Sequence, residues 1–238
     1  MLGNRVSSAV SELVFGTADP WGSASIGTPT RGSLVAGVEL TPGDGIELAG
    51  DYHWGTASVV RSIERAVREV RRCHPGAPDL YVGDISREEG GWLRPHRSHQ
   101  AGLDADIGFY YVGPASWYER ATAKNLDVVR TWALFRALVD GGNVETIFVD
   151  RSIQELLKAH LAKAAPADRP PEGFFEKSRL SPAIVRHTWG HATHFHVRFR
   201  DPDAVERGLA LFDPMEKGPN RVVRVRPRGP AKGSPKKR

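Results

Sequence analysis

A helical period of apolar residues is the clearest pattern in the chain. Between Ala57 and Arg72 the apolar positions follow one another at intervals of three or four, with Arg or Glu between them. These apolar positions are Val60, Ile63, Val67 and Val70. One face of an α-helix has this period, so we expect a helix here with its apolar face in the core. Pro75 and Gly76 follow as helix-ending residues.

Two further helices are predicted in the second half of the chain. The first runs from about Leu126 to Val139, and Gly141 follows it as a stop signal. Its expected core face consists of Val128, Trp132, Phe135 and Val139. A capping-box pattern of Ser152 with Glu155 indicates the start of the second helix, which is expected to end near Ala164. A loop is then expected at three prolines, Pro166, Pro170 and Pro171.

Short apolar runs predict strands between these helices. They cover residues 80–85, 105–112, 144–149 and 194–199. Residues 17–55 are rich in Gly, Pro, Ser and Thr, so we expect an irregular arm with short strands that packs on the domain. Strands interspersed with a few helices indicate an α+β domain.

The charge of the chain is concentrated at its C-terminal end. The 238 residues carry a formal net charge of +5, with 33 basic and 28 acidic residues. Residues 219–238 hold eight Lys or Arg and no acidic residue, so the remainder has 25 basic against 28 acidic residues, a net charge of −3. A uniformly basic nucleic-acid-binding domain is therefore not supported. We expect an N-terminal extension at 1–16, one domain at 17–218 and a basic, disordered tail at 219–238.

The tail leaves two interpretations open. Its positive charge suits contact with an anionic polymer, such as nucleic acid, wall polymer or membrane headgroups. The alternative, which we favour, is a disordered solubilising segment that binds nothing. Nowhere does the chain approach the roughly 18 consecutive apolar residues of a membrane span. The first residues show no secretory signal pattern. Cys73 is the one cysteine, which excludes an intrachain disulfide, and we expect it to be a small buried residue.

Two clusters contain most of the histidines. His96 and His99 lie in RPHRSHQAGLDADIGFY, and the second cluster is RHTWGHATHFHVRF. The second cluster contributes His187, His191, His194 and His196. Neutral imidazole and carboxylate are the usual ligands of catalytic zinc, so the clusters suggest a metal site. The alternative is that these are ordinary core or surface histidines.

Strand geometry sharpens the metal interpretation. Residues two apart in a strand point to the same face, so His194 and His196 can reach one site, as can Asp104 and Asp106. His99 precedes Asp106 by seven residues, and a loop followed by a strand can bring both to one metal. A site with two His and one Asp keeps a fourth zinc position for water, which favours catalysis over a structural role. A general base would then be His194 or His191.

These segments resemble a known family. SHQAGLDADIGFY and HATHFHVRF are similar to the penicillin-insensitive murein endopeptidases, which share a superfamily with lysostaphin-like peptidases, D-Ala-D-Ala metallopeptidases and hedgehog domains. The common pattern is H-x6-D followed much later by H-x-H. SIGTPTRGSLVAGVEL and VGDISREEGGWLRPHRSH also resemble this branch, and the resemblance covers about residues 22–200. It implies a single α+β domain with a mostly antiparallel central sheet flanked by helices.

The resemblance also implies roles for individual residues. His99, Asp106 and His196 would be the ligands of one zinc ion, and His194 would be the catalytic base. The remaining residues implied near the metal or substrate are His191, with a possible catalytic role, and His96, Ser98, Gln100, Asp104 and Trp189. Trp189 is a candidate wall of the cleft or, equally, a core residue.

The implied activity is hydrolysis of the D-alanyl–meso-diaminopimelyl cross-link of peptidoglycan, in the periplasm or cell envelope. Two alternatives remain. A D,D-carboxypeptidase or dipeptidase would need an Arg near the metal for the substrate carboxylate, and the candidates are Arg94, Arg97 and Arg186. A non-catalytic zinc-binding module would need no base such as His194. Known members carry several cysteines, whereas this chain carries one.

Overall fold

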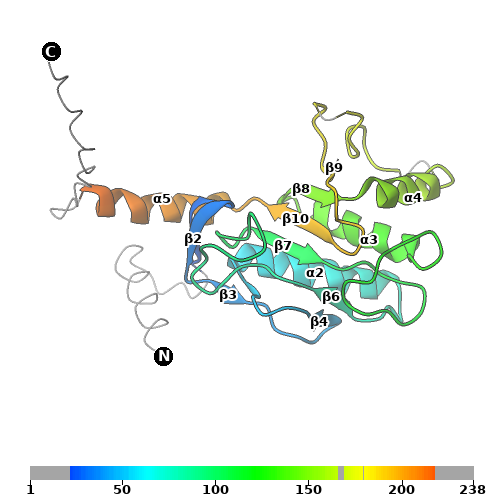
Figure 1. The fold of residues 1–238 in the computed structure, drawn as a ribbon, viewed down its shortest axis with the longest axis horizontal. Helices are drawn as coiled ribbons and strands as arrows, with labels where there is room; N and C mark the ends of the chain where they lie inside the picture. Colours follow the sequence, from blue (N-terminus) through cyan, green and yellow to red (C-terminus); the bar gives the residue numbers. More distant parts are fainter. Residues whose placement is uncertain (1–21, 166–168, 179, 218–238) are drawn as a thin grey trace, which may run out of the picture.

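A six-stranded sheet forms the centre of the molecule. The computed structural model describes residues 22–165, 169–178 and 180–217. The strand order in the sheet is β4-β6-β7-β10-β8-β9, and Figure 1 shows the strands fanning across the middle of the domain. The strands are β4 (Ile46–Leu48), β6 (Leu80–Val82), β7 (Asp104–Ile107), β10 (Phe195–Phe199), β8 (Val144–Val149) and β9 (Val185–His187).

The pairing of these strands is mixed but mostly antiparallel. β6, β7, β10 and β8 form three consecutive antiparallel pairs, while β4 joins β6 and β9 joins β8 in parallel. The predicted α+β fold with a mostly antiparallel central sheet is therefore confirmed. Strands β4 and β9 were not predicted as separate elements of this sheet.

Helices cover the apolar face of the sheet. They are α2 (Ala57–Cys73), α3 (Val128–Val139) and α4 (Arg151–Leu161). The predicted face of α2 is buried in the main core, and the side chain of Thr56 caps its first turn by accepting from the Val59 N–H. In α3, Trp132 and Phe135 are buried as expected, while Val128 and Val139 are half-buried. The helical period thus identified the residues that hold α2 and α3 against the sheet.

The central strands β7 and β10 have one apolar face in the core and one face that carries ionisable side chains. Ala105 and Ile107 of β7 belong to the apolar core, as do Phe195 and Val197 of β10. The alternate residues face the other side, where His196 lies opposite Asp106 in the antiparallel register. In the same register Arg198 lies opposite Asp104. Because side chains alternate along a strand, one face of this pair is apolar and the other carries buried ionisable groups.

The N-terminal arm consists of short strands, as predicted. β1 (Ala24–Thr28) and β2 (Arg31–Val35) form a hairpin, and β3 (Val38–Glu39) pairs with β5 (Trp54–Gly55). The hairpin packs against α5 (Pro202–Lys217), a helix that the sequence patterns did not reveal. Figure 1 shows α5 extending from the sheet beside the hairpin. Gly208 permits this contact, since a Cβ there would lie 2.0 Å from the Ser25 carbonyl oxygen.

Several predicted boundaries were wrong. The strand expected at 105–112 ends at Ile107, because the following aromatic residues leave the sheet and are buried in a loop. The strand expected at 80–85 ends at Val82. Helix α4 is capped by Asp150, which accepts from the Ser152 N–H, so Ser152 is not the cap, and the helix ends at Leu161.

Some predictions concern residues beyond those described. The extension at 1–16 and the basic tail at 219–238 lie outside the described residues. Within the described part of the chain, none of the helices has the length and apolarity needed to cross a membrane. Cys73 is exposed, so the prediction that it is buried was wrong. It occupies the last position of α2, where the apolar face of the helix has already turned away from it.

Candidate metal centre

Three side chains converge on one point above the β7–β10 pair. The Nε2 atom of His99 lies 3.1 Å from Nδ1 of His196 and 3.4 Å from Oδ1 of Asp106. The same Nδ1 atom of His196 lies 3.1 Å from Oδ1 of Asp106. All three residues are buried, with exposed fractions of 1% for His99, 3% for Asp106 and 7% for His196. The structure thus brings together the three residues that the family resemblance implied as ligands.

The outer hydrogen bonds of the two histidines fix their tautomers. Nδ1 of His99 donates to the Ile85 carbonyl oxygen at 2.9 Å, and Nε2 of His196 donates to the Asp104 carboxylate at 3.1 Å. In the neutral rings, the facing nitrogens must then carry lone pairs. With Oδ1 of Asp106 they form three acceptors directed at one another, which only a cation or an added proton can stabilise.

Asp104 supports this arrangement from below. It is fully buried and accepts from the backbone N–H of His99 at 3.1 Å and from Nε of Arg198 at 2.8 Å, in addition to His196. His99 itself has a positive φ of 67°, a backbone conformation unusual for a residue with a side chain. The bond to Asp104 helps to hold His99 in this conformation.

The charges in the cluster shift its pKa values. Burial lowers the pKa of His196, but hydrogen bonds to Asp104 and Asp106 outweigh burial and raise the pKa to about 9. Burial raises the pKa of Asp106, yet the hydrogen bonds of His196 and His99 hold it well below its ordinary value. The protein without metal therefore places a proton on His196, where a cation would otherwise satisfy the same acceptors.

His96 occupies the other side of Asp106. Its Nδ1 atom lies 3.5 Å from Oδ2 of Asp106, and its Nε2 atom lies 3.1 Å from Oδ2 of Asp84. The hydrogen bond to Asp84 raises the pKa of His96 although burial opposes this. Ligand atoms of His96, His99 and Asp106 all lie within 4.8 Å of one another, so they form a second possible metal set. His96 is thus closer to a ligand position than the sequence suggested.

His194 and His191 lie beside the cluster and line the same cleft. Nε2 of His194 is 3.7 Å from Oδ2 of Asp106, and the rings of His194 and His191 are 4.9 Å apart. Burial lowers the pKa of His194 to about 4 and also lowers that of His191. Both rings are therefore neutral at pH 7. A neutral imidazole has the lone pair that a proton acceptor requires.

A cleft of about 430 Å³ gives access to the cluster. His96, Ser98, His191 and His194 line it together with the three converging residues. Gln100 is buried and its amide lies near the Arg97 carbonyl oxygen, and it is not among the residues that line the cleft. Trp189 is 83% exposed, so it is not a core residue.

The arginine candidates are distributed unevenly. Arg97 lines the cleft and is exposed, whereas Arg94 and Arg186 are not among the lining residues. His187, the remaining histidine of the second cluster, lies away from the metal set: its Nδ1 accepts from the backbone N–H of Arg151 at 3.0 Å, at the start of α4.

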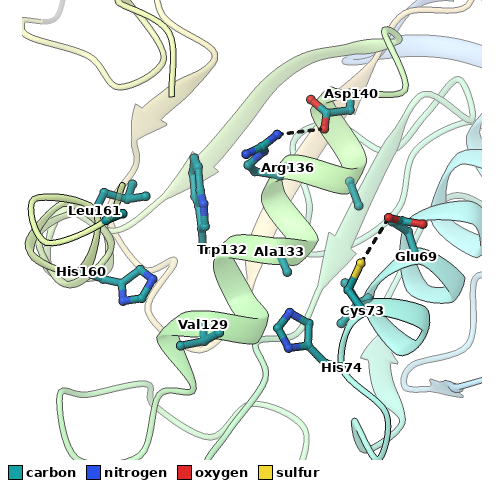
Figure 2. A pocket seen from close by; sticks show the side chains of 13 residues that line it. Glu69, Cys73, His74, Val129, Trp132, Ala133, Arg136, Asp140, His160 and Leu161 are labelled. Atoms are coloured by element: carbon teal, nitrogen blue, oxygen red, sulfur yellow. Dashed lines mark hydrogen bonds and ion pairs between the residues drawn. The ribbon is translucent and has the colours of Figure 1, made fainter. Parts of the chain in front are cut away.

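A larger hollow of about 590 Å³ lies elsewhere, between α2, α3 and α4 (Figure 2). Figure 2 shows Trp132 and Leu161 on one side and Cys73 on the other, where the thiol lies 3.3 Å from a Glu69 carboxylate oxygen. The hollow contains none of the residues of the metal cluster. Cavity size therefore does not identify the reactive site of this molecule.

Two residues of the site were missed by sequence reasoning. Asp84 holds His96, and Tyr118 lines the cleft with its ring 5.1 Å from the ring of His194. Tyr118 lies outside the histidine-containing segments, and Asp84 was not singled out although it lies within VGDISREEGGWLRPHRSH. The one available signal was that Asp84 is a charged residue within the run at 80–85, which was predicted as a strand and which ends at Val82 in the structure.

The fold and the site together define a class. The chain is an α+β protein whose antiparallel central strands present an imidazole–carboxylate cluster, able to hold a metal ion, at the base of an open cleft. Its sequence matches the family model of penicillin-insensitive murein endopeptidase over residues 25–210, and the chain belongs to this family.

Individual relatives carry the same description. The chain is 32% identical over 203 residues to a penicillin-insensitive murein endopeptidase of Haemophilus influenzae. The aligned region covers 76% of this chain and 65% of that relative. It is 30% identical over 172 residues to that of Pectobacterium atrosepticum, covering 65% of this chain and 55% of the relative. A Klebsiella pneumoniae relative is 28% identical over 215 residues, covering 78% and 72%. The match thus spans less than two thirds of the first two relatives.

Proposed function

We propose that this protein is a zinc-dependent endopeptidase that hydrolyses the D-alanyl–meso-diaminopimelyl cross-links of peptidoglycan. The observation that carries the proposal is the convergence of three buried acceptor atoms, from His99, Asp106 and His196, in a cleft with two neutral histidines. Family membership supports the substrate class. Because that substrate lies in the cell envelope, we also propose the periplasm or cell envelope as the place of action.

The donor set fits zinc. In a tetrahedral site with ligand bonds of about 2.0–2.1 Å, the ligand atoms lie roughly 3.3 Å from one another. The three separations between His99 Nε2, His196 Nδ1 and Asp106 Oδ1 are 3.1, 3.1 and 3.4 Å. Zinc bound there would supply a polarised carbonyl and a water whose pKa is lowered toward about 7. With three protein ligands, a fourth position would remain for that water.

The residues around the set would perform the remaining tasks. Asp104 orients His196 through its Nε2–H, an outer contact that typically fixes the direction of a metal-binding imidazole. His194 is neutral and lies beside Asp106, so we assign to it acceptance of the proton from the attacking water. His191, next to His194, would assist this transfer or orient the substrate.

Product analysis tests the reaction. Purified cross-linked muropeptide dimers and uncross-linked pentapeptide monomers are incubated separately with the zinc-loaded protein, and the products are identified by mass spectrometry. We expect dimers to be split into monomers at the D-alanyl–diaminopimelyl bond. His194→Gln serves as the control, and it should leave the dimers intact.

The outcomes separate the alternatives. Release of D-alanine from monomers with intact dimers would identify a carboxypeptidase, for which Arg97 in the cleft could bind the terminal carboxylate. No cleavage of either substrate by zinc-loaded wild-type protein would refute the proposal and favour a binding module.

A further inference from the structure

Residues 116–121, between β7 and α3, form a segment that contributes Tyr118 to the lining of the cleft. Trp117, in this segment, lies against Gly83, which directly follows β6. A Cβ at Gly83 would meet the Trp117 ring at 2.5 Å, and the ring centroid is 6.3 Å from that of Tyr81. Glycine at position 83 therefore lets Trp117 anchor the segment.

The same segment is fastened to the loop that carries the catalytic histidines. The backbone N–H of Ala121 donates to the Ala192 carbonyl oxygen at 2.8 Å, between His191 and His194 in sequence. The hydroxyl of the buried Tyr111 also donates to the carbonyl oxygen of Glu119. These two bonds hold the segment just after Tyr118, and the contacts of Trp117 hold it just before Tyr118.

Tyr118 has an unusual backbone conformation for a bulky residue. Its φ is +69°, in the left-handed region that favours glycine. The side chain lines the cleft, 56% exposed, with its ring 5.1 Å from the ring of His194 at an interplanar angle of 33°. Strained residues of this kind persist where the surrounding structure enforces them, and they cluster at functional sites.

The Tyr118 hydroxyl is suited to donate a hydrogen bond. Burial, followed by the negative charges of Asp106 and Asp84, raises the pKa of Tyr118, so the hydroxyl keeps its proton at pH 7. The neighbouring groups described above are mainly the Asp106 carboxylate, which accepts hydrogen bonds, and the neutral rings of His194 and His191. Arg198, which also lines the cleft, already binds Asp104 through its guanidinium. A donor beside His194 is what a scissile carbonyl oxygen needs as it gains negative charge.

We propose that Tyr118 is a further catalytic residue, whose hydroxyl donates a hydrogen bond to the carbonyl oxygen of the scissile amide during hydrolysis. This inference rests on the proposed endopeptidase function. The bond would strengthen as the oxygen becomes negative, so it would act mainly on kcat. The strained backbone at Tyr118 and the anchor at Trp117 would hold the hydroxyl in place before the substrate arrives.

Tyr118→Phe tests the proposal, because it keeps the ring and removes only the hydroxyl. Steady-state kinetics on the muropeptide dimer should show kcat lowered about 10- to 100-fold with KM within about twofold of the wild type. Zinc content and melting temperature should not change. Tyr52→Phe is the matched control, since Tyr52 packs against Arg87 and does not line the cleft. It should retain wild-type kcat.

The possible failures are distinct. If the wild-type protein cleaves the dimer and Tyr118→Phe retains its kcat, this inference is overturned, whether or not KM rises, because the hydroxyl then does not act at the scissile bond. If the wild-type protein itself does not cleave the dimer, the proposed function has failed instead. In that case a binding measurement with the uncleaved dimer should show Tyr118→Phe binding as wild type does, since the proposed contact forms mainly in the transition state.

Discussion

Replacing Asp104 by Asn should weaken zinc binding without removing any ligand. The Asp104 carboxylate accepts from three donors: Nε2 of His196 at 3.1 Å, the His99 backbone N–H at 3.1 Å and the Arg198 guanidinium at 2.8 Å. An amide has the same shape, but only one of its two terminal atoms can accept a hydrogen bond. At least one donor is therefore left facing an N–H₂ group in a buried site.

The expected size follows from this loss. Removing an outer hydrogen-bond partner of a metal-binding histidine typically lowers metal affinity 10- to 100-fold, or about 1.4–2.8 kcal/mol. The metal-free protein should also lose stability, because Arg198 loses its charge partner. Breaking a buried pair costs about 3–5 kcal/mol, and we expect about 2–3 kcal/mol here because water reaches the Arg198 side chain, which is 22% exposed.

Zinc affinity is measured by competition with a chromophoric chelator, and stability by urea unfolding of the metal-free protein. Asp201→Asn is the matched control: Asp201 is buried and caps α5 through the Ala204 N–H at 3.0 Å, away from the cluster. It should lower stability modestly and leave zinc affinity unchanged. Asp104→Asn with zinc affinity within twofold of the wild type would refute the supporting role of Asp104.

Three other predictions concern the ligands, the base and the fold. His194→Gln should keep one zinc per chain and lower kcat about 10²- to 10⁴-fold, and a metal assay showing loss of zinc would make His194 a ligand. His196→Ala should lose zinc while His96→Ala retains it, and the opposite result would select the set that contains His96. Asp150→Ala should destabilise the protein by about 1 kcal/mol at pH 7 through loss of the α4 cap. Burial raises the pKa of Asp150, but the hydrogen bonds from Ser152 outweigh burial and lower the pKa below its ordinary value of 3.8. The cap therefore stabilises the protein above pH 3.8, and this stabilisation is lost as the pH falls and the carboxylate is protonated. Urea unfolding at pH 7 and pH 3 should show the difference from wild type shrinking in acid, and a constant difference would contradict it.

Much of the fold could be predicted from periodic patterns of apolar and polar residues in the sequence. The face of α2 was predicted because a helix that packs on a sheet repeats its apolar residues every three or four positions. Alternation in strands likewise grouped Asp104 with Asp106 and separated them from Ala105. Helix α5 was missed because its partner is the β1 hairpin far away in sequence, and the contact rests on backbone proximity at Gly208.

The site was predictable only where its residues form local motifs. His99, Asp106 and His196 lie in recognisable segments, and the β7–β10 register brings two of them opposite each other. Asp84 and Tyr118 reach the site from separate loops, by a hydrogen bond to His96 and by a left-handed backbone conformation. Such long-range contacts leave no periodic trace in the sequence.

The most direct test of the central claim is a zinc titration of endopeptidase activity. Metal-free protein receives increasing amounts of zinc, and cleavage of cross-linked muropeptide dimers is followed by mass spectrometry. We predict that the rate rises from near zero and reaches its plateau at one equivalent of zinc per chain. Full cleavage by the metal-free protein, or no cleavage at one equivalent of bound zinc, would contradict it.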